Sequence, residues 1–319
     1  MLKRFYLLIL IVLLVGCSSS RQSVTVPMIQ QDSVNNMGAY RQVPAFTQVN
    51  ATGHINLHLH TGYAKPQLIL KGDPRDLAET ITGVDGTTLY ITVKKGFPKY
   101  GHIIADIRGQ FLNTLTYQGS GLIYGPKLHT SYLELDLENQ GTTVIGGTIG
   151  LQKLHVAGNG ITRISGIKSH DLRIRLRDNP KVQLSGSVSL SRLNVEGDGW
   201  LSMFWLKSPS LIIKARNNSK IQLAGMVNRL EIELWGSATF KGRYLRANRS
   251  FVKTHDTSTA EISSVNHQST LASDSSDIYY YNLSVTRADF MADSGSVLDM
   301  RSWGQYDLKD FTRYNKQFP

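Results

Sequence analysis

The chain has 319 residues, a formal charge of +11 and a single cysteine. One cysteine excludes an intrachain disulfide, so the fold is not a disulfide scaffold. The positive charge either reflects a diffuse basic surface or favours anionic lipid, lipopolysaccharide or acidic polysaccharide as a partner. No nucleic-acid recognition motif is present, and we expect no nucleic-acid partner.

The first sixteen residues have the pattern of a cleaved export signal. Lys3 and Arg4 form a positive n-region, residues 7–15 are all Leu, Ile or Val, and the small residue Gly16 precedes Cys17. About 20 apolar residues are needed to span a bilayer, so this run predicts a signal peptide rather than a transmembrane helix. An ordinary secretory signal followed by an incidental cysteine is the alternative.

Residues 14–17, Leu-Val-Gly-Cys, resemble the lipobox of bacterial lipoproteins. The resemblance implies cleavage before Cys17 and acylation of its sulfur and its new amine, which would anchor the chain stably in a membrane. Removal of Lys3 and Arg4, two positive charges, leaves +9 on the mature chain. Ser18 stands where an Asp would imply retention in the inner membrane. The resemblance therefore favours the outer membrane and leaves a periplasmic or surface-facing orientation open.

Residues 17–45 follow the signal as a stretch rich in Gln, Ser, Asn and Val, which predicts a flexible tether. A folded head is expected over 46–299, with a tail or cap over 300–319. Within the head, residues 73–77, Asp-Pro-Arg-Asp-Leu, predict one or two helical turns, because Asp can cap and Pro can take the first helical position. Asp85-Gly86 predicts a hairpin turn before a strand over 89–93.

An internal repeat of about 20 residues dominates the rest of the head. Nine short strands begin at intervals of about 20 residues between positions 133 and 290. The first six strands show an apolar residue at the start and another two positions later, whereas the last three have Lys253, Ser273 and Ala292 at that second position. The predicted strand starts are Leu133, Leu154, Leu172, Leu193, Leu211, Leu230, Phe251, Leu271 and Phe290.

Residues that tolerate a left-handed backbone recur in phase with these strands and predict sharp corners. They are Asn139, Asn159, Asn179, Asp198, Asn218 and Gly236. Short strands and corners with a period of about 20 residues predict an all-β fold, a parallel β-solenoid with a more irregular strand-rich N-terminal part. An antiparallel sandwich, which shows strands at a spacing of about 8–12 residues, is the alternative.

The head resembles the head GIN-domain family of exported bacterial proteins, which are labelled auto-transporter adhesins. The resemblance runs from Phe46 to Asp299 and rests on segments such as residues 55–59 (INLHL), 67–72 (QLILKG), 84–91 (VDGTTLYI), 154–160 (LHVAGNG) and 193–199 (LNVEGDG). It implies a right-handed solenoid, a lipid anchor and no catalytic residues or cofactor that could be carried over. The later coils depart from the family pattern, since Ser, Thr and Asp replace their glycines.

Three histidines, His54, His58 and His60, alternate with apolar residues and so share one face of a strand. Imidazoles at this spacing could bind a soft divalent ion. No Cys, Asp or Glu lies in the segment to complete a site, and a solvated polar face is the alternative.

Carboxylates concentrate in the last coils. Stacked carboxylates on a solenoid could act as acid and base on a polysaccharide or bind Ca²⁺, or they could be solvated corner residues. These carboxylates belong to Asp274, Asp277, Asp289, Asp293 and Asp299.

Aromatic side chains supply the remaining candidate binding residues. Exposed rings along a solenoid could stack on sugar rings or contact a protein, or they could fill the core. The candidates are Trp200, Trp205, Trp235, Tyr279, Tyr280 and Tyr281, with Phe204 and Tyr244 beside them.

No signature of a hydrolase, metalloprotease, P-loop or dinucleotide-binding enzyme occurs in the chain. We therefore expect a non-enzymatic, lipid-anchored envelope protein whose solenoid head serves adhesion, surface display or envelope interaction. A polysaccharide-cleaving enzyme that uses the late aspartates and a periplasmic scaffold for another envelope protein are the alternatives. The candidate partners of the head are an anionic envelope glycan, lipopolysaccharide or a host surface, and the sequence leaves the choice among them and the oligomeric state open.

Overall fold

The computed structural model describes residues 38–282 and 285–300. The predicted signal peptide, Cys17 and most of the predicted tether lie outside these residues, as does the tail from 301. All described residues belong to one compact unit of the chain. None of the helices among the described residues is long and apolar enough to cross a membrane.

Eight long strands form the body of this unit. They are β9 (Ile123–Asn139), β10 (Thr142–Ala157), β11 (Ile161–Leu176), β12 (Lys181–Val195), β13 (Trp200–Ala215), β14 (Lys220–Leu234), β15 (Thr239–Thr254) and β16 (Thr259–Ser273). Each strand bends near its middle, where its register with the neighbouring strands shifts. It therefore supplies two legs to one coil, called here the first leg and the second leg.

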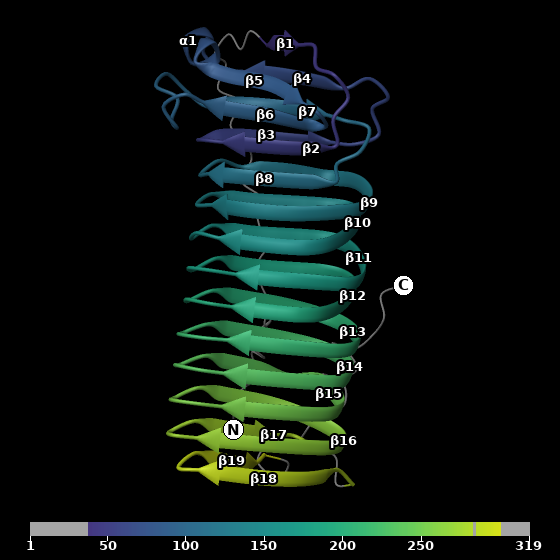
Figure 1. The fold of residues 1–319 in the computed structure, drawn as a ribbon, viewed down its shortest axis with the longest axis vertical. Coiled ribbons are helices and arrows are strands. Elements are labelled where there is room, and N and C mark those ends of the chain that lie inside the picture. The colour runs from purple at the N-terminus through teal and green to yellow at the C-terminus, as the bar shows by residue number, and fades with distance from the viewer. Residues whose placement is uncertain (1–37, 283–284, 301–319) are drawn as a thin grey trace, which may run out of the picture. The chain divides into compact units, whose positions relative to one another are not determined.

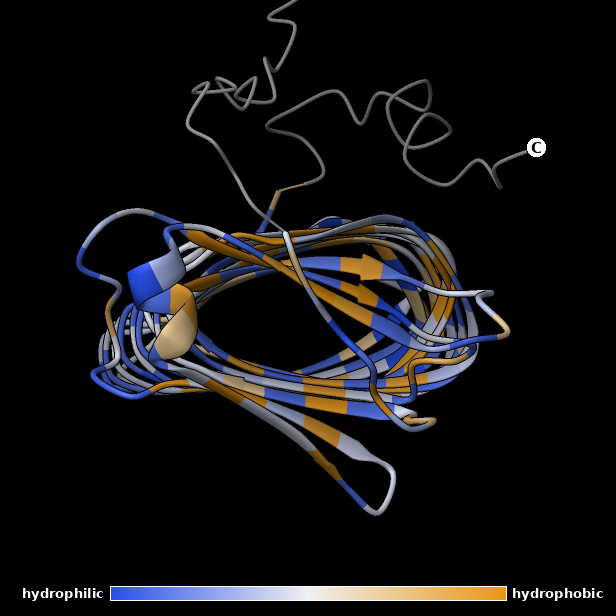
Figure 2. Ribbon diagram, turned by 90° about the horizontal axis from the view of Figure 1, so that it is seen from above, coloured by the Kyte–Doolittle hydropathy of each residue, from blue (hydrophilic) through white to orange (hydrophobic). Residues whose placement is uncertain are grey.

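The long strands stack rung over rung, each pairing in parallel with the strands of the coils before and after it. Figure 1 shows this stack from the side, and Figure 2 shows from above that each coil follows a flattened oval path. At the C-terminal end, β17 (Asp277–Tyr280) and then β19 (Ser296–Asp299) continue the first legs, and β18 (Arg287–Asp293) continues the second legs. The parallel solenoid prediction is confirmed, and the antiparallel sandwich alternative is wrong.

Strand register corrects the predicted phase of the repeat. One column of aligned second-leg residues takes one residue from each coil and keeps the period of about 20 residues. Four predicted starts, such as Leu133 and Leu172, lie two residues before this column. The twelve apolar residues of the first six strand pairs are all at most 2% exposed, as predicted. The aligned column is Leu135, Leu154, Ile174, Leu193, Ile213, Ile232, Val252, Thr270 and Phe290.

The apolar pattern fails after residue 250 because the predicted start Phe251 is one residue out of register and polar residues take inward positions. Val252 aligns with Ile232, and Ser250 and Thr254 on either side of it are buried. Phe251 is 41% exposed, while its neighbour Val252 is fully buried. The interior of these coils is partly polar, and several of its polar groups form hydrogen bonds with one another. Asn282 Oδ1 accepts from the backbone N–H of Ser264 at 2.8 Å, and Asn282 Nδ2 donates to Gln268 Oε1 at 2.5 Å.

The corners after β10 to β16 are left-handed, but usually one residue earlier than predicted, whereas the predicted corner at Asn139 after β9 has no left-handed residue at or beside it. The predicted corner residues Asn159, Asn179, Asp198 and Asn218 each directly follow the residue with positive φ, whereas Gly236 itself has positive φ. The observed series is Gly158, Asp178, Gly197, Asn217, Gly236, Asp256 and Asp274.

A second left-handed series marks the bend inside the long strands, where one coil presses on the next. Its members are Gly147, Gly166, Gly186, Trp205 and Gly225. At Gly225 a Cβ would lie 2.0 Å from the carbonyl oxygen of Leu206 in the preceding coil, so a side chain there would push two rungs apart. This position therefore requires glycine for close approach as well as for φ, although Trp205 takes the left-handed conformation at the bend of its own coil.

An irregular cap closes the N-terminal end of the solenoid (Figure 1). Its elements are β1 (Ala39–Arg41), β2 (Gln48–Thr52), β3 (Ile55–His60), β4 (Gln67–Lys71), α1 (Pro74–Ala78), β5 (Thr80–Asp85), β6 (Thr88–Val93), β7 (Ile103–Arg108) and β8 (Thr114–Gly119). β4 pairs antiparallel with β1 and β7, and β5 with β6. The predicted helix and the predicted hairpin at Asp85-Gly86 are both confirmed. Asp73 caps α1 by accepting from the backbone N–H of Arg75 at 2.9 Å.

Candidate anion-binding ladder

The predicted tryptophans lie on different parts of the coil. Trp200 is half-buried on a first leg, in register with Lys181 and Lys220. Trp205 occupies the bend with φ of 61°, in edge contact with Phe204. The three tryptophans therefore do not come together as one binding surface, since Trp235 follows a second leg.

Trp235 is held in a stack of its own. Its ring lies 5.7 Å from the ring of His255 in the next coil, at an interplanar angle of 13°. The guanidinium of Arg216, one coil earlier, lies 4.7 Å from its centroid. This row of a cation and two rings stabilises the corner by stacking.

The three consecutive tyrosines alternate between the two faces of β17 and its extension. Tyr280 is only 8% exposed and stacks on Phe290 at 5.1 Å, so it belongs to the core, which corrects its selection as a ligand-binding residue. Tyr279 and Tyr281 are half-buried on the outer face, where Arg243 lies over the Tyr281 ring at 4.5 Å. Burial raises the pKa of the Tyr281 hydroxyl, and Glu261 adds to this shift.

The predicted histidines do lie on the outer face of the cap, but they meet a carboxylate from another strand. His60 Nε2 lies 3.5 Å from Oδ1 of Asp106 on β7, and Asp106 also binds Arg108 through both oxygens. Burial lowers the pKa of His58, with His60 and Lys71 adding to this effect and Asp106 opposing it. Burial and the nearby His102 lower the pKa of His54. Nowhere in the described part of the chain do three His, Cys, Asp or Glu side chains group as metal ligands.

The late aspartates are spread over the coil. Asp274 is at a left-handed corner, where its Oδ2 accepts from the backbone N–H of Asp256 at 3.1 Å. Asp277 and Asp299 are on first legs, whereas Asp289 and Asp293 are on a second leg. These five residues therefore do not form the single row of stacked acid and base carboxylates that the enzyme alternative needs.

A column of basic side chains, which the sequence reasoning missed, lies where the bend meets the second leg of the late coils. Register aligns Arg229 with Arg249, Arg249 with His267, and His267 with Arg287. The three arginines are exposed and the histidine is half-buried. We call these four residues the basic ladder.

A row of asparagines runs directly beside the basic ladder. Asn248 Nδ2 donates to Asn228 Oδ1 at 2.8 Å, and Asn266 Nδ2 donates to Asn248 Oδ1. These bonds tie three successive coils together along the exposed edge and leave further amide N–H and C=O groups beside the cations. An open pocket of about 470 Å³ is lined by Asn266 and three members of the ladder, Arg249, His267 and Arg287.

The basic ladder concentrates positive charge with little local compensation. Adjacent rungs of a sheet are about 4.8 Å apart, so neighbouring cations in register repel one another. Among the described residues, the ion pairs of the ladder involve a single carboxylate, Asp289, which lies 3.1 Å from His267 Nε2 and 3.7 Å from Arg287 Nε. An anion bound along the column would relieve this repulsion.

The sequence carried only a faint signal of the ladder. Arg229 precedes Arg249 by about one repeat, and Arg249 precedes Arg287 by about two repeats. They could have been aligned from the repeat alone, but the strand starts used for the prediction mixed two registers. Only hydrogen-bond register places these residues in one column.

Comparison with known proteins places this fold in a family. The model of the family described as "Putative auto-transporter adhesin, head GIN domain" matches residues 45–192 and 181–283. No curated protein matches the chain.

Two solved structures share the fold, each described as a "putative adhesin". The protein from Parabacteroides merdae is 13% identical, with a TM-score of 0.50 over 83% of this chain and 95% of its own. The protein from Parabacteroides distasonis gives the same identity and TM-score, over 83% of this chain and 96% of its own. The family match covers well over half of the chain, so this β-solenoid protein belongs to the head GIN-domain family of adhesin-like proteins.

Proposed function

We propose that the chain is a lipid-anchored adhesin of the cell envelope that binds linear anionic glycan along its basic ladder. The observation that supports this proposal is the alignment of Arg229, Arg249, His267 and Arg287 on successive coils. A polymer with acidic groups on successive sugars can follow such a column, and each contact adds to the affinity without any single strong site.

The rigid body of the solenoid suits this role. Its ladder is built on paired strands rather than on loops, so the cations are held in register before a ligand binds. The asparagine row supplies uncharged hydrogen-bonding groups for sugar hydroxyls beside the cations. This role is binding rather than catalysis, and the adhesin descriptions of the family and of the two solved structures agree with it.

Anchoring is the second part of the proposal. The leader over residues 1–16 and the lipobox-like residues 14–17 support lipidation of Cys17 and attachment to the outer membrane. Metabolic labelling with an alkyne fatty acid, in the intact chain and in Cys17→Ser, tests this part. We expect the label only in the chain that keeps Cys17, and equal labelling of both would refute lipidation there.

Glycan binding is tested with the leaderless chain carrying Cys17→Ser. Titration with heparin and with polygalacturonate, a sulfated and a carboxylated chain, is followed at several salt concentrations, with neutral dextran as the blank. We expect binding to both polyanions, weakening as salt rises, and no binding to dextran. Binding that is unchanged in Arg229→Gln/Arg249→Gln would refute the ladder as the site.

A further inference from the structure

The N-terminal cap carries a second surface that the proposed function does not use. The loop over residues 94–102, here called the cap loop, leads from β6 to β7 and has the sequence KKGFPKYGH. Phe97 is 66% exposed and Tyr100 is 52% exposed. Lys94, Lys95 and Lys99 are also exposed, so large aromatic and cationic side chains alternate on one short loop.

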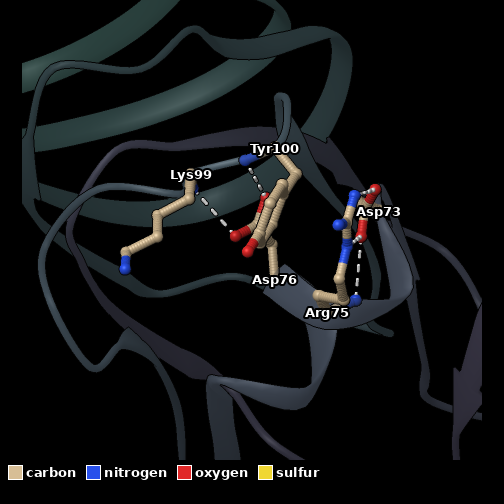
Figure 3. Close-up of polar contacts among 5 residues, drawn as sticks. All are labelled: Asp73, Arg75, Asp76, Lys99 and Tyr100. Atoms are coloured by element: carbon tan, nitrogen blue, oxygen red, sulfur yellow. Dashed lines mark hydrogen bonds and ion pairs between the residues drawn. The ribbon is translucent and has the colours of Figure 1, made fainter.

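The cap loop is held in place by hydrogen bonds between its backbone and α1. The carboxylate of Asp76 on α1, only 4% exposed, accepts from the backbone N–H groups of Lys99 at 2.8 Å and Tyr100 at 2.7 Å. Figure 3 shows the Asp76 carboxylate between these two groups, while the side chain of Lys99 extends away from it. Such charge-assisted bonds are among the stronger ones in proteins, so α1 holds the loop in one conformation.

The aromatic rings of the cap loop are also supported from one side. The Arg75 guanidinium lies 3.5 Å from the centroid of the Tyr100 ring, and Asp73 binds that guanidinium through both of its oxygens (Figure 3). The ring of His54 stacks on Phe97 at 5.7 Å and 23°. Both rings therefore keep one supported face and still present much of their surface outward.

The chain enters the folded unit at this same cap. β1, the first described strand, pairs with β4, and Arg41 on β1 donates to the carbonyl oxygens of Thr80 at 3.0 Å and Leu77 at 3.2 Å. The segment from Cys17 to Gly38 can span no more than about 70–75 Å even when fully extended. Because Cys17 precedes the cap in the chain, a lipid on Cys17 would attach to the bilayer through a segment that joins the folded unit at the cap and not at the ladder.

We propose that the cap loop is a membrane contact that rests on the surface of an anionic lipid bilayer. Aromatic side chains favour the boundary between headgroups and acyl chains, and lysines are drawn to acidic headgroups. The two kinds of side chain on the cap loop match that boundary, with Phe97 and Tyr100 inserted at it and the lysines at the phosphates. This inference extends the proposed anchoring, but the contact itself needs no lipid on the protein.

Vesicle binding by the leaderless Cys17→Ser chain tests the contact directly. Vesicles of pure phosphatidylcholine and vesicles containing phosphatidylglycerol are compared by co-sedimentation. We expect binding only to the anionic vesicles. An attraction of about fivefold per lysine predicts a loss on the order of 25-fold in Lys95→Gln/Lys99→Gln. The matched control is Lys181→Gln/Lys220→Gln, two exposed lysines on first legs of the solenoid body, which should bind like the parent.

Site-specific fluorescence then identifies the inserted residue. An environment-sensitive dye is placed on Phe97→Cys or on Met291→Cys, since both residues are apolar and 66% exposed and lie at opposite ends of the solenoid. We expect a blue shift with anionic vesicles only for the dye at position 97. Equal shifts at both positions, or no binding of the parent chain to anionic vesicles, would overturn the membrane contact. Those results would leave polyanion binding by the ladder unaffected, because that is measured with soluble glycans.

Discussion

Replacing Arg249 with Gln should stabilise the protein while weakening its binding of polyanions. Arg249 lies one rung from Arg229 and two rungs from Arg287 in the basic ladder. The substitution removes one charge from the middle of the column and keeps a polar side chain of similar length. A gain in stability together with a loss of binding is the result expected if the charges of the column are arranged for a ligand.

The expected gain follows from the rung spacing. Two unit charges about 4.8 Å apart in water repel by about 0.9 kcal/mol, and the charge two rungs away adds about 0.4 kcal/mol. Flexible arginine side chains spread apart, and Asp289 offsets part of the field, so we expect a gain of about 0.5–1 kcal/mol at low salt. In about 1 M salt the screening length falls to about 3 Å and the gain should nearly vanish.

Arg163→Gln is the matched control for this experiment. Arg163 is also exposed, but its register neighbours are Val144 and Gln183, so its removal lowers the net charge equally without relieving a column. Urea unfolding followed by circular dichroism at low and high salt gives the free energies of unfolding, and heparin titration gives the affinities. The reasoning would be refuted if Arg249→Gln lost stability at low salt, or if the two variants bound heparin equally.

Three further substitutions probe the scaffold. Gly225→Ala should lower the free energy of unfolding in urea by about 3 kcal/mol, because it combines an unfavourable φ with a Cβ 2.0 Å from a carbonyl oxygen. The control Gly83→Ala should be nearly neutral, because there is open space around Gly83. Asp76→Ala should cost about 3 kcal/mol and speed hydrogen exchange at the two amides that it binds; unchanged exchange there would contradict the role given to this carboxylate. Burial raises the pKa of Glu261, an effect that Lys241 and Arg243 oppose, so its contribution to stability is present at low pH and is lost as pH rises through the folded-state pKa. Glu261→Gln should therefore be more stable than the parent at pH 7 and equal to it below about pH 4, and a gain that persists at pH 3 would contradict this assignment.

The local pattern of the repeat was sufficient to predict most of the fold. Inward Leu, Ile and Val that recur once per repeat, followed by Asn, Asp or Gly, require a short buried strand and a corner in each coil. The prediction failed where the pattern admits two alignments, as at Leu133 and Leu135, because both face inward and an apolar period of two does not distinguish them. It failed again at Phe251, because polar residues such as Ser250 take inward positions there and the apolar pattern no longer marks the inward column.

By itself, the sequence determined the repeat length, the short helix capped by Asp73 and the class of fold, because each depends on residues close together in the chain. Tertiary structure alone decided which residues stand above one another. Arg229 and Arg287 are about three repeats apart in the chain, and only the hydrogen bonds between rungs bring them into one column with Arg249 and His267. The same holds for Asp76 and the amides of Lys99 and Tyr100, because a buried carboxylate finds its donors through packing and not through sequence spacing.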